Sequence, residues 1–192
     1  MPSRDSLLPG EQRTLLRIAR DSIAHGLRTG RPLCVEPSDC ERGLRDPRAV
    51  FVTLRKQGAL RGCIGELEPS RTLVESVAYH AYTAAFFDPR FSPVRIDELD
   101  ALDIHVSVLS PLEEIVFETE DDLVAKLRPG EDGLLLQDGV HRATFLPAVW
   151  ESLGEPWRFL RELKRKAGLP EQHGSPHLRA WRYEVDEFPA KA

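Results

Sequence analysis

The sequence predicts an α+β fold in which a mainly antiparallel sheet is packed against helices. Two pairs of strand-like segments joined by short turns, and one helix with a clear start signal, support this class. Strands and helices do not alternate regularly, as they would in a parallel-sheet protein. With 192 residues, of which 41% are hydrophobic, the chain is long enough to bury a full core.

The first half of the chain carries one predicted hairpin. Residues 49–54 form an apolar, β-branched run, a turn follows at 56–58, and residues 60–67 return as the second strand. Residues 104–108 alternate between apolar and polar side chains, which predicts a strand that buries one face.

The second half carries another hairpin and a last strand. Residues 134–137 and 140–146 are the two arms, and Asp138-Gly139 between them is typical of a type I′ turn. Trp181, Tyr183 and Val185 alternate with charged residues, which predicts the final strand.

Helices are predicted on both sides of the first hairpin. An amphipathic helix is expected between Gly10 and Gly26, closed by the second glycine. The next helix starts at a capping box formed by Thr72 and Glu75, and it must end before Pro89, which disfavours helical geometry in the residue preceding it. Shorter helices are expected at 121–127 and 156–167.

We expect residues 11–188 to form one domain, with two interleaved lobes as the alternative arrangement, and residues 1–10 and 189–192 to be flexible ends. The net charge of −5 argues against a general nucleic-acid binder, which needs a basic face for phosphate contacts. No apolar run reaches membrane-spanning length, and the first residues lack a signal-peptide core. The sequence therefore predicts a cytoplasmic protein without a membrane partner.

Three cysteines, Cys34, Cys40 and Cys63, form no CxxC pair, so free thiols are expected. Cys63 is the candidate catalytic residue, because Gly62 and Gly65 on either side let a ligand or another backbone approach closely. Arg61 lies two residues before Cys63, on the same face of a regular strand, where its charge would favour the thiolate. The alternative is a packed core cysteine beside a glycine-marked bulge.

A second group of candidate residues lies at the exit of the central helix. Arg90 can grip an anionic ligand, with Asp88 and Phe91 completing the corner, or it can simply pair with Asp88. His80 within that helix is a conceivable general base, although a core histidine is the simpler interpretation.

Several motifs, in order along the chain, resemble those of one known family. They are LRGCIG at 60–65, AAFFDPRF at 84–91, IHVSVLSP at 104–111, GLLL at 133–136 and TFLPAVW at 144–150. Together they resemble the AMMECR-domain family over nearly the whole chain. In two places the sequence departs from that pattern: His105 stands where the family more often has an acid, and Ala143 stands where a glycine is common.

The resemblance implies an α+β fold with a larger and a smaller lobe, whose signature residues line a shared cleft. Bacterial and archaeal members are called AmmeMemoRadiSam system protein A, which makes a Memo-type protein and a radical S-adenosylmethionine enzyme candidate partners. The resemblance implies no known reaction. The chain itself lacks a CxxxCxxC cluster motif and metal-binding patterns such as HExxH, so no metal or other cofactor is expected.

Two functional hypotheses follow. In the first, the chain is an enzyme or enzyme subunit in which Cys63 is the nucleophile and Arg61 and Arg90 hold an anionic group of a small molecule or modified residue. In the second, it is a non-catalytic module that docks a partner protein through the same residues. The uneven charge, acidic over 97–132 and basic over 157–169, suits the second.

Overall fold

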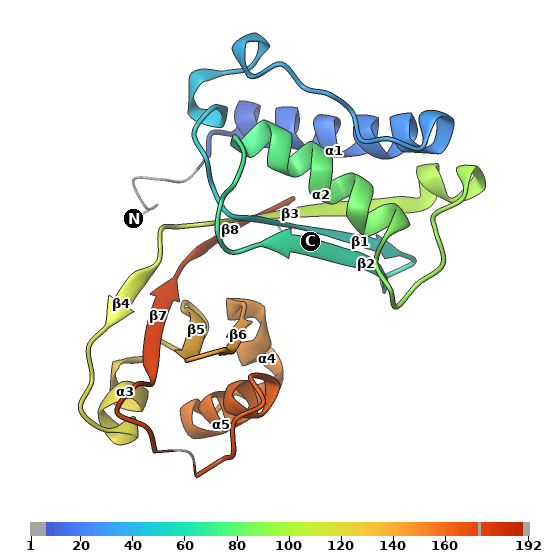
Figure 1. The fold of residues 1–192 in the computed structure, drawn as a ribbon. Helices are drawn as coiled ribbons and strands as arrows, with labels where there is room; N and C mark the ends of the chain where they lie inside the picture. Colours follow the sequence, from blue (N-terminus) through green and yellow to red (C-terminus); the bar gives the residue numbers. More distant parts are fainter. Residues whose placement is uncertain (1–6, 173, 190–192) are drawn as a thin grey trace. The chain divides into compact units, whose positions relative to one another are not determined.

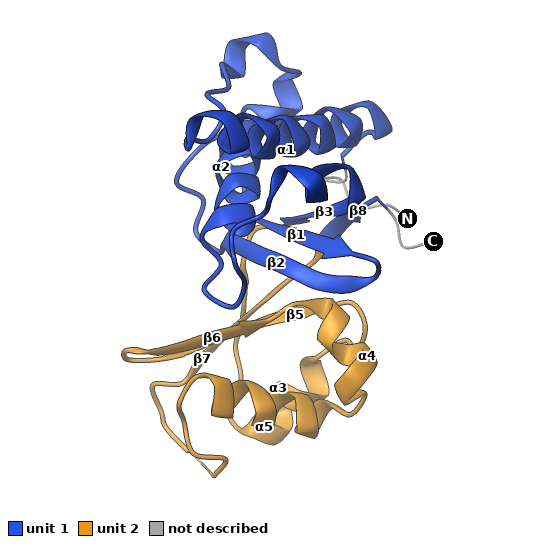
Figure 2. Ribbon diagram, turned by 90° about the vertical axis from the view of Figure 1, so that its right-hand side faces the viewer, with its two compact units in different colours: residues 1–110, 186–192 blue, residues 111–185 orange. Residues whose placement is uncertain are grey.

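The structure, a computed structural model, describes residues 7–172 and 174–189 and has the predicted α+β architecture. It divides into two compact units, which are residues 1–110 with 186–192 and residues 111–185 (Figure 2). Each unit contains its own four-stranded sheet. The predicted flexible ends fall largely outside the described residues, and the first helix already begins at Pro9. No helix in the described part of the chain is long and apolar enough to cross a membrane.

The first unit is a sheet of strand order β2-β1-β3-β8 with two helices on one face (Figure 1). The strand β8 comes from the end of the chain and joins the sheet beside β3. The elements are α1 (Pro9–Thr29), β1 (Val50–Lys56), β2 (Ala59–Glu66), α2 (Leu73–Phe86), β3 (Leu102–Leu109) and β8 (Val185–Phe188), with short 3₁₀ turns at Pro37–Asp39, Arg42–Leu44 and Ile96–Ala101.

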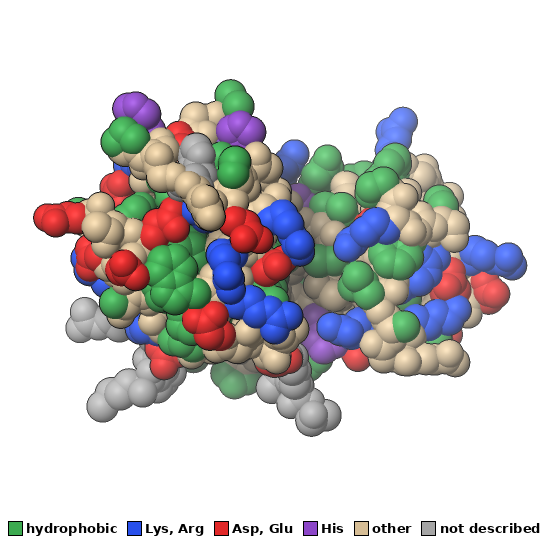
Figure 3. Space-filling model, turned by 90° about the horizontal axis from the view of Figure 1, so that it is seen from below, with side chains coloured by type: hydrophobic (Ala, Val, Ile, Leu, Met, Phe, Trp, Pro, Cys, Tyr) green, Lys and Arg blue, Asp and Glu red, His purple; other side chains and the backbone are tan. Residues whose placement is uncertain are grey.

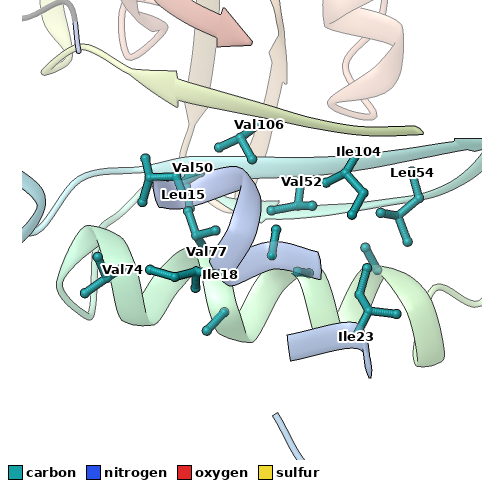
Figure 4. Packing of buried hydrophobic residues seen from close by; sticks show 14 of the residues in the cluster. Leu15, Ile18, Ile23, Val50, Val52, Leu54, Val74, Val77, Ile104 and Val106 are labelled. Atoms are coloured by element: carbon teal, nitrogen blue, oxygen red, sulfur yellow. The ribbon is translucent and has the colours of Figure 1, made fainter. Parts of the chain in front are cut away.

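The core of this unit fills the space between the helices and the sheet (Figure 4). Every second residue of β1 and β3 points into it, and for β3 this is the predicted alternation. The face that they form is called the helix-covered face below, and its central side chains are Val52, Leu54, Ile104 and Val106.

Helix α1 is longer than predicted. Its apolar face is the predicted one, but it runs through Gly26 and ends at Gly30, whose positive φ of 70° is the left-handed cap geometry. At Gly26 an added Cβ would lie 2.6 Å from the rings of Tyr82 and Phe86 on α2. Gly26 is therefore a packing residue that lets the two helices approach closely, and not the stop signal that its spacing suggested.

Helix α2 has the predicted start and end. The Glu75 carboxylate accepts hydrogen bonds from the Thr72 N–H at 3.0 Å and from the Thr72 hydroxyl at 2.6 Å. The helix ends at Phe86, two residues before Asp88. Its long apolar face packs on both the sheet and α1, which fixes where its C-terminal end lies relative to β2.

The first hairpin contains a β-bulge that the sequence did not reveal. Its turn, Gln57-Gly58, is the predicted one, and both residues have positive φ. The pairing runs regularly from Lys56 and Ala59 to Arg55 and Leu60, and then skips Arg61, so that Gly62 opposes Leu54. After the bulge, every residue of β2 is therefore paired with a β1 residue one position later in the sequence than a regular hairpin would give.

The second unit has a sheet of order β4-β7-β5-β6 with helices packed on it. Gly139-Val140 connects β5 and β6, one residue later than predicted; only Gly139 has positive φ, so the turn is not type I′. The predicted final strand is split, because residues 179–183 pair with β5 and residues 185–188 belong to the first unit's sheet. The elements are β4 (Glu113–Ile115), α3 (Glu120–Lys126), β5 (Gly133–Asp138), β6 (His141–Phe145), a 3₁₀ turn (Pro147–Val149), α4 (Trp150–Leu153), α5 (Pro156–Lys166) and β7 (Arg179–Tyr183).

Candidate functional site

Cys63 lies on β2, where the corner that follows α2 holds its backbone. The Cys63 N–H donates to Asp88 Oδ2 at 2.8 Å, and Arg90 Nη2 donates to the Cys63 carbonyl oxygen at 3.3 Å. The side chain of Asp88 is only 1% exposed. The two motifs that sequence analysis placed 25 residues apart are therefore joined in one structure.

Asp88 and Arg90 form a bidentate ion pair within this corner. Arg90 Nε donates to Asp88 Oδ1 at 2.9 Å, and Nη2 donates to Oδ2 at 2.7 Å. These bonds hold the pKa of the Asp88 carboxyl well below its usual range. The guanidinium also lies 5.5 Å from the centre of the Phe91 ring. Because the Arg90 side chain is 53% exposed, it can pair with Asp88 and still be reached by an anion.

The two glycines that flank Cys63-Ile64 are both required by close backbone approach. A Cβ on Gly62 would collide with the carbonyl oxygen of Ala84 on α2. A Cβ on Gly65 would collide with the carbonyl oxygen of Val50 and the ring of Phe51. Gly62 therefore lets β2 approach α2, and Gly65 lets β2 approach β1.

Arg61 is the extra residue of the bulge, and its guanidinium is held by a carboxylate and by loop carbonyls. Its Nε and Nη2 donate to the two carboxylate oxygens of Glu98 at 3.1 and 3.0 Å, and Nη1 donates to the Ser92 carbonyl at 2.9 Å. Lys56 Nζ donates to the same carboxylate at 2.9 Å. Hydrogen bonds from Arg61 and Lys56 hold the pKa of Glu98 well below its usual range.

The bulge also decides which face of the sheet carries Cys63. After it, Cys63 opposes Thr53, whose hydroxyl lies 3.3 Å from the Cys63 sulfur. Thr53 alternates with the core residues Val52 and Leu54, so Cys63 lies on the face opposite α1 and α2. This second face is called the polar face below; its central side chains are Thr53, Cys63, Asp103 and His105.

Sequence reasoning did not assign Thr53, His105 or Glu98 to the site. Thr53 and His105 follow from strand register, which the bulge shifts by one residue. Glu98 had a weak signal, since a buried arginine needs an acidic partner, but nothing in the sequence selects it among the acids of 97–132.

His80 is buried in α2, as a core histidine is expected to be. Its Nε2 lies 3.5 Å from Glu66 Oε1, and burial lowers its pKa. The described residues contain no group of three or more His, Cys, Asp or Glu side chains that could hold a metal ion.

The family model for AMMECR1 matches residues 16–188, which is most of the chain. The chain belongs to the AMMECR1 family. A protein of Methanothermobacter thermautotrophicus is 41% identical over 180 residues, which cover 93% of both chains. Protein PH0010 of Pyrococcus horikoshii is 39% identical over 162 residues, which cover 81% of this chain and 78% of that protein.

A solved structure supports both the AMMECR1 assignment and the fold. The crystal structure of the uncharacterized protein PH0010 from Pyrococcus horikoshii matches with a TM-score of 0.84 at 35% sequence identity. The match covers 94% of this AMMECR1 chain and 92% of that one. The fold is therefore shared over nearly its full length, while the reaction has to be argued from the residues.

Proposed function

We propose that this AMMECR1 protein is an enzyme or enzyme subunit in which Cys63 is the nucleophile or covalent anchor for a small anionic substrate or modified residue. The observation that carries the proposal is the position of the Cys63 sulfur, on the polar face and 3.3 Å from the Thr53 hydroxyl. A core thiol would instead lie between the helices and the sheet. A hydroxyl hydrogen bond to sulfur stabilises the thiolate, which is the reactive form.

Arg90 is the proposed contact for the anionic group of the substrate. Its guanidinium is half exposed, and one hydrogen bond links it to the carbonyl of Cys63. Asp88 fixes its orientation, and the neighbouring Phe91 ring borders it. Arg61 receives a different role: because Glu98 and two loop carbonyls hold its guanidinium, it fixes the bulge that turns Cys63 to the polar face.

The experiment is alkylation of the native protein with iodoacetamide at neutral pH, followed by mass spectrometry. Cys63 should be alkylated faster than Cys34 or Cys40. Cys40 is an internal reference, because burial, and then the charges of Glu41 and Asp39, raise the pKa of its thiol. If Cys63 stays unmodified while the other two react, the nucleophile proposal is abandoned.

The role of Arg90 is tested by the charge of the reagent. Iodoacetate carries the negative charge that iodoacetamide lacks, so Arg90→Gln should lower the ratio of the iodoacetate rate to the iodoacetamide rate several-fold. Arg95→Gln is the matched control, since Arg95 is an exposed arginine that pairs with Asp97. If Arg90→Gln and Arg95→Gln have the same ratio of iodoacetate rate to iodoacetamide rate, Arg90 does not contact the anionic group.

The alternative function is a docking module. It is favoured by Phe87, which is 64% exposed directly before Asp88, where an aromatic side chain can anchor a partner. Figure 3 shows Lys and Arg side chains interspersed with Asp and Glu on the face that it draws. In a module, Cys63→Ser would leave affinity for the partner intact, whereas Phe87→Ala would reduce it.

The partner and location proposals rest on the motif resemblance. We propose that the protein acts in the cytoplasm, as an AmmeMemoRadiSam system protein A, with a Memo-type protein and a radical S-adenosylmethionine enzyme. The test is co-expression of the three proteins from one organism, followed by size-exclusion chromatography. Separate elution at micromolar concentration would contradict a stable assembly.

A further inference from the structure

The polar face carries a second reactive group in the same cross-strand row as Cys63. Thr53 of β1 is paired with Cys63 of β2 on one side and with His105 of β3 on the other. Neighbouring strands lie about 4.8 Å apart, so the backbones of β2 and β3 are about 10 Å apart with Thr53 between them. A thiol, a hydroxyl and an imidazole therefore follow one another across the sheet.

The Thr53 hydroxyl lies between the two ends of this row. It lies 3.3 Å from the Cys63 sulfur. A hydroxyl has one proton to donate and lone pairs to accept another, so it can take the thiol proton while it gives up its own. Valine, which has the same shape but no hydroxyl, cannot do this in the same position.

His105 has the hydrogen-bond arrangement of a base. Its Nε2 lies 3.2 Å from Asp103 Oδ2, and a carboxylate there keeps the proton on Nε2. Its Nδ1 is buried and has no hydrogen-bond partner among the described residues, with Glu187 Oε1 3.7 Å away. Arg55 of β1 also belongs to this face, where its backbone is paired with that of Asp103 in the strand register. In the tautomer with the proton on Nε2, the Nδ1 lone pair can accept a proton.

We propose, resting on the role of Cys63 given above, that Cys63, Thr53 and His105 form an acyl-transfer site for an anionic ester or thioester. In this structure the Thr53 hydroxyl donates to the Cys63 sulfur, and in the proposed step it turns toward His105 Nδ1. The Cys63 S–H bond then breaks, its proton passes to Thr53, and the Thr53 proton passes to Nδ1. The sulfur then bonds to the acyl carbon, and the imidazolium returns its proton to the departing alcohol or thiol. Water, deprotonated by the same imidazole, releases the acid and restores the thiol.

Asp103 acts as a positioning residue in this scheme, and Glu187 completes the negative surroundings of the imidazolium. A carboxylate that orients the imidazole and stabilises its charged form is the arrangement used by cysteine and serine acyl-transfer enzymes on unrelated folds. Here the arrangement is built on adjacent strands, which hold each side chain more rigidly than loops would.

The test uses the full chain and p-nitrophenyl acetate, an activated ester that reports acylation through release of p-nitrophenolate. The native protein should release p-nitrophenolate and carry an acetyl group on Cys63 in the mass spectrum. His105→Asn and Thr53→Val should each slow the release at least tenfold, because a general base contributes about 10²-fold or more. Thr53→Ser keeps the hydroxyl and should stay within threefold of the native rate.

His25→Asn is the matched control, because it makes the same change on α1, away from the polar face, and should leave the rate unchanged. Thermal melts show which variants are folded. If His105→Asn is unfolded, the comparison of Thr53→Val with Thr53→Ser tests the inference. Rates within twofold of native in folded His105→Asn and Thr53→Val overturn the inference. A Cys63 that iodoacetamide alkylates but the ester does not acylate also overturns it, and leaves the nucleophile proposal standing. If neither iodoacetamide nor the ester modifies Cys63, both the acyl-transfer inference and the nucleophile proposal are overturned.

Discussion

The two faces of the β2-β1-β3 sheet differ in role. One face packs in the core and the other carries the candidate reactive groups, although both are formed by alternate residues of the same strands. On the helix-covered face, Val52, Leu54, Ile104 and Val106 are almost completely buried against α1 and α2. On the polar face, the intervening positions include Thr53, Cys63 and His105, which carry a hydroxyl, a thiol and an imidazole. Because side chains of a strand alternate with period two, neighbouring residues can be under entirely different constraints. Substitutions on the two faces should therefore differ in both size and kind of effect.

The largest expected effect is on the helix-covered face. Leu54 is 0% exposed, and Leu54→Ala should lower the free energy of unfolding by about 4 kcal/mol through lost transfer energy and the cavity left behind. Urea denaturation followed by circular dichroism measures it. A loss under about 1 kcal/mol would mean that this face is not a close-packed core.

Gly62→Ala should be nearly as damaging, at about 3 kcal/mol, since the new Cβ meets the backbone oxygen of Ala84 and a backbone cannot move aside like a flexible side chain. Gly10→Ala is the control in the same unit, because a Cβ there meets only the tip of Arg13 at 4.0 Å. Equal melting temperatures for the two variants would contradict the close approach of α2 to β2.

Glu98→Gln should cost about 2 kcal/mol, because it leaves Arg61 and Lys56 without a carboxylate at a site where the acid is only 11% exposed. The pKa of Glu98 is lower in the folded than in the unfolded chain. The unfolded chain therefore binds more protons in acid, so this stabilisation is present above about pH 4 and is lost as the pH falls below it.

Measuring unfolding free energy from pH 7 to pH 3 tests the sign of this effect. The native protein should lose more stability over that range than Glu98→Gln does. Asp97→Asn provides the reference, since Asp97 belongs to an exposed pair with Arg95. Parallel pH curves for the native protein and Glu98→Gln would mean that the carboxylate is not held by Arg61.

The smallest effect on stability is expected at the nucleophile itself. Cys63 is only half-buried and lies on the polar face, so Cys63→Ala should change the free energy of unfolding by less than about 1 kcal/mol. The same substitution should abolish ester acylation. A loss comparable to that of Leu54→Ala would identify Cys63 as a packed core residue and remove the difference between the two faces.

The sequence by itself determined the features that depend on neighbouring residues. The capping box at Thr72, the turn at Gln57-Gly58 and the helix end before Pro89 were all predicted and are all present. Each of these follows from backbone geometry within a few residues, so local sequence contains the information. The motifs also sufficed to indicate the family.

Only the tertiary structure decided the partners. An uninterrupted hairpin would place Val52 opposite Cys63 and turn the thiol into the core, whereas the bulge at Arg61 shifts the register to Thr53. The acid that holds Arg61 comes from a 3₁₀ turn 37 residues later. A one-residue shift exchanges the two faces of a strand, and it depends on close packing with α2 and on an ion pair between distant segments. Local sequence cannot predict the packing of α2 on β2 or the ion pair between Arg61 and Glu98, because both form only when the chain has folded.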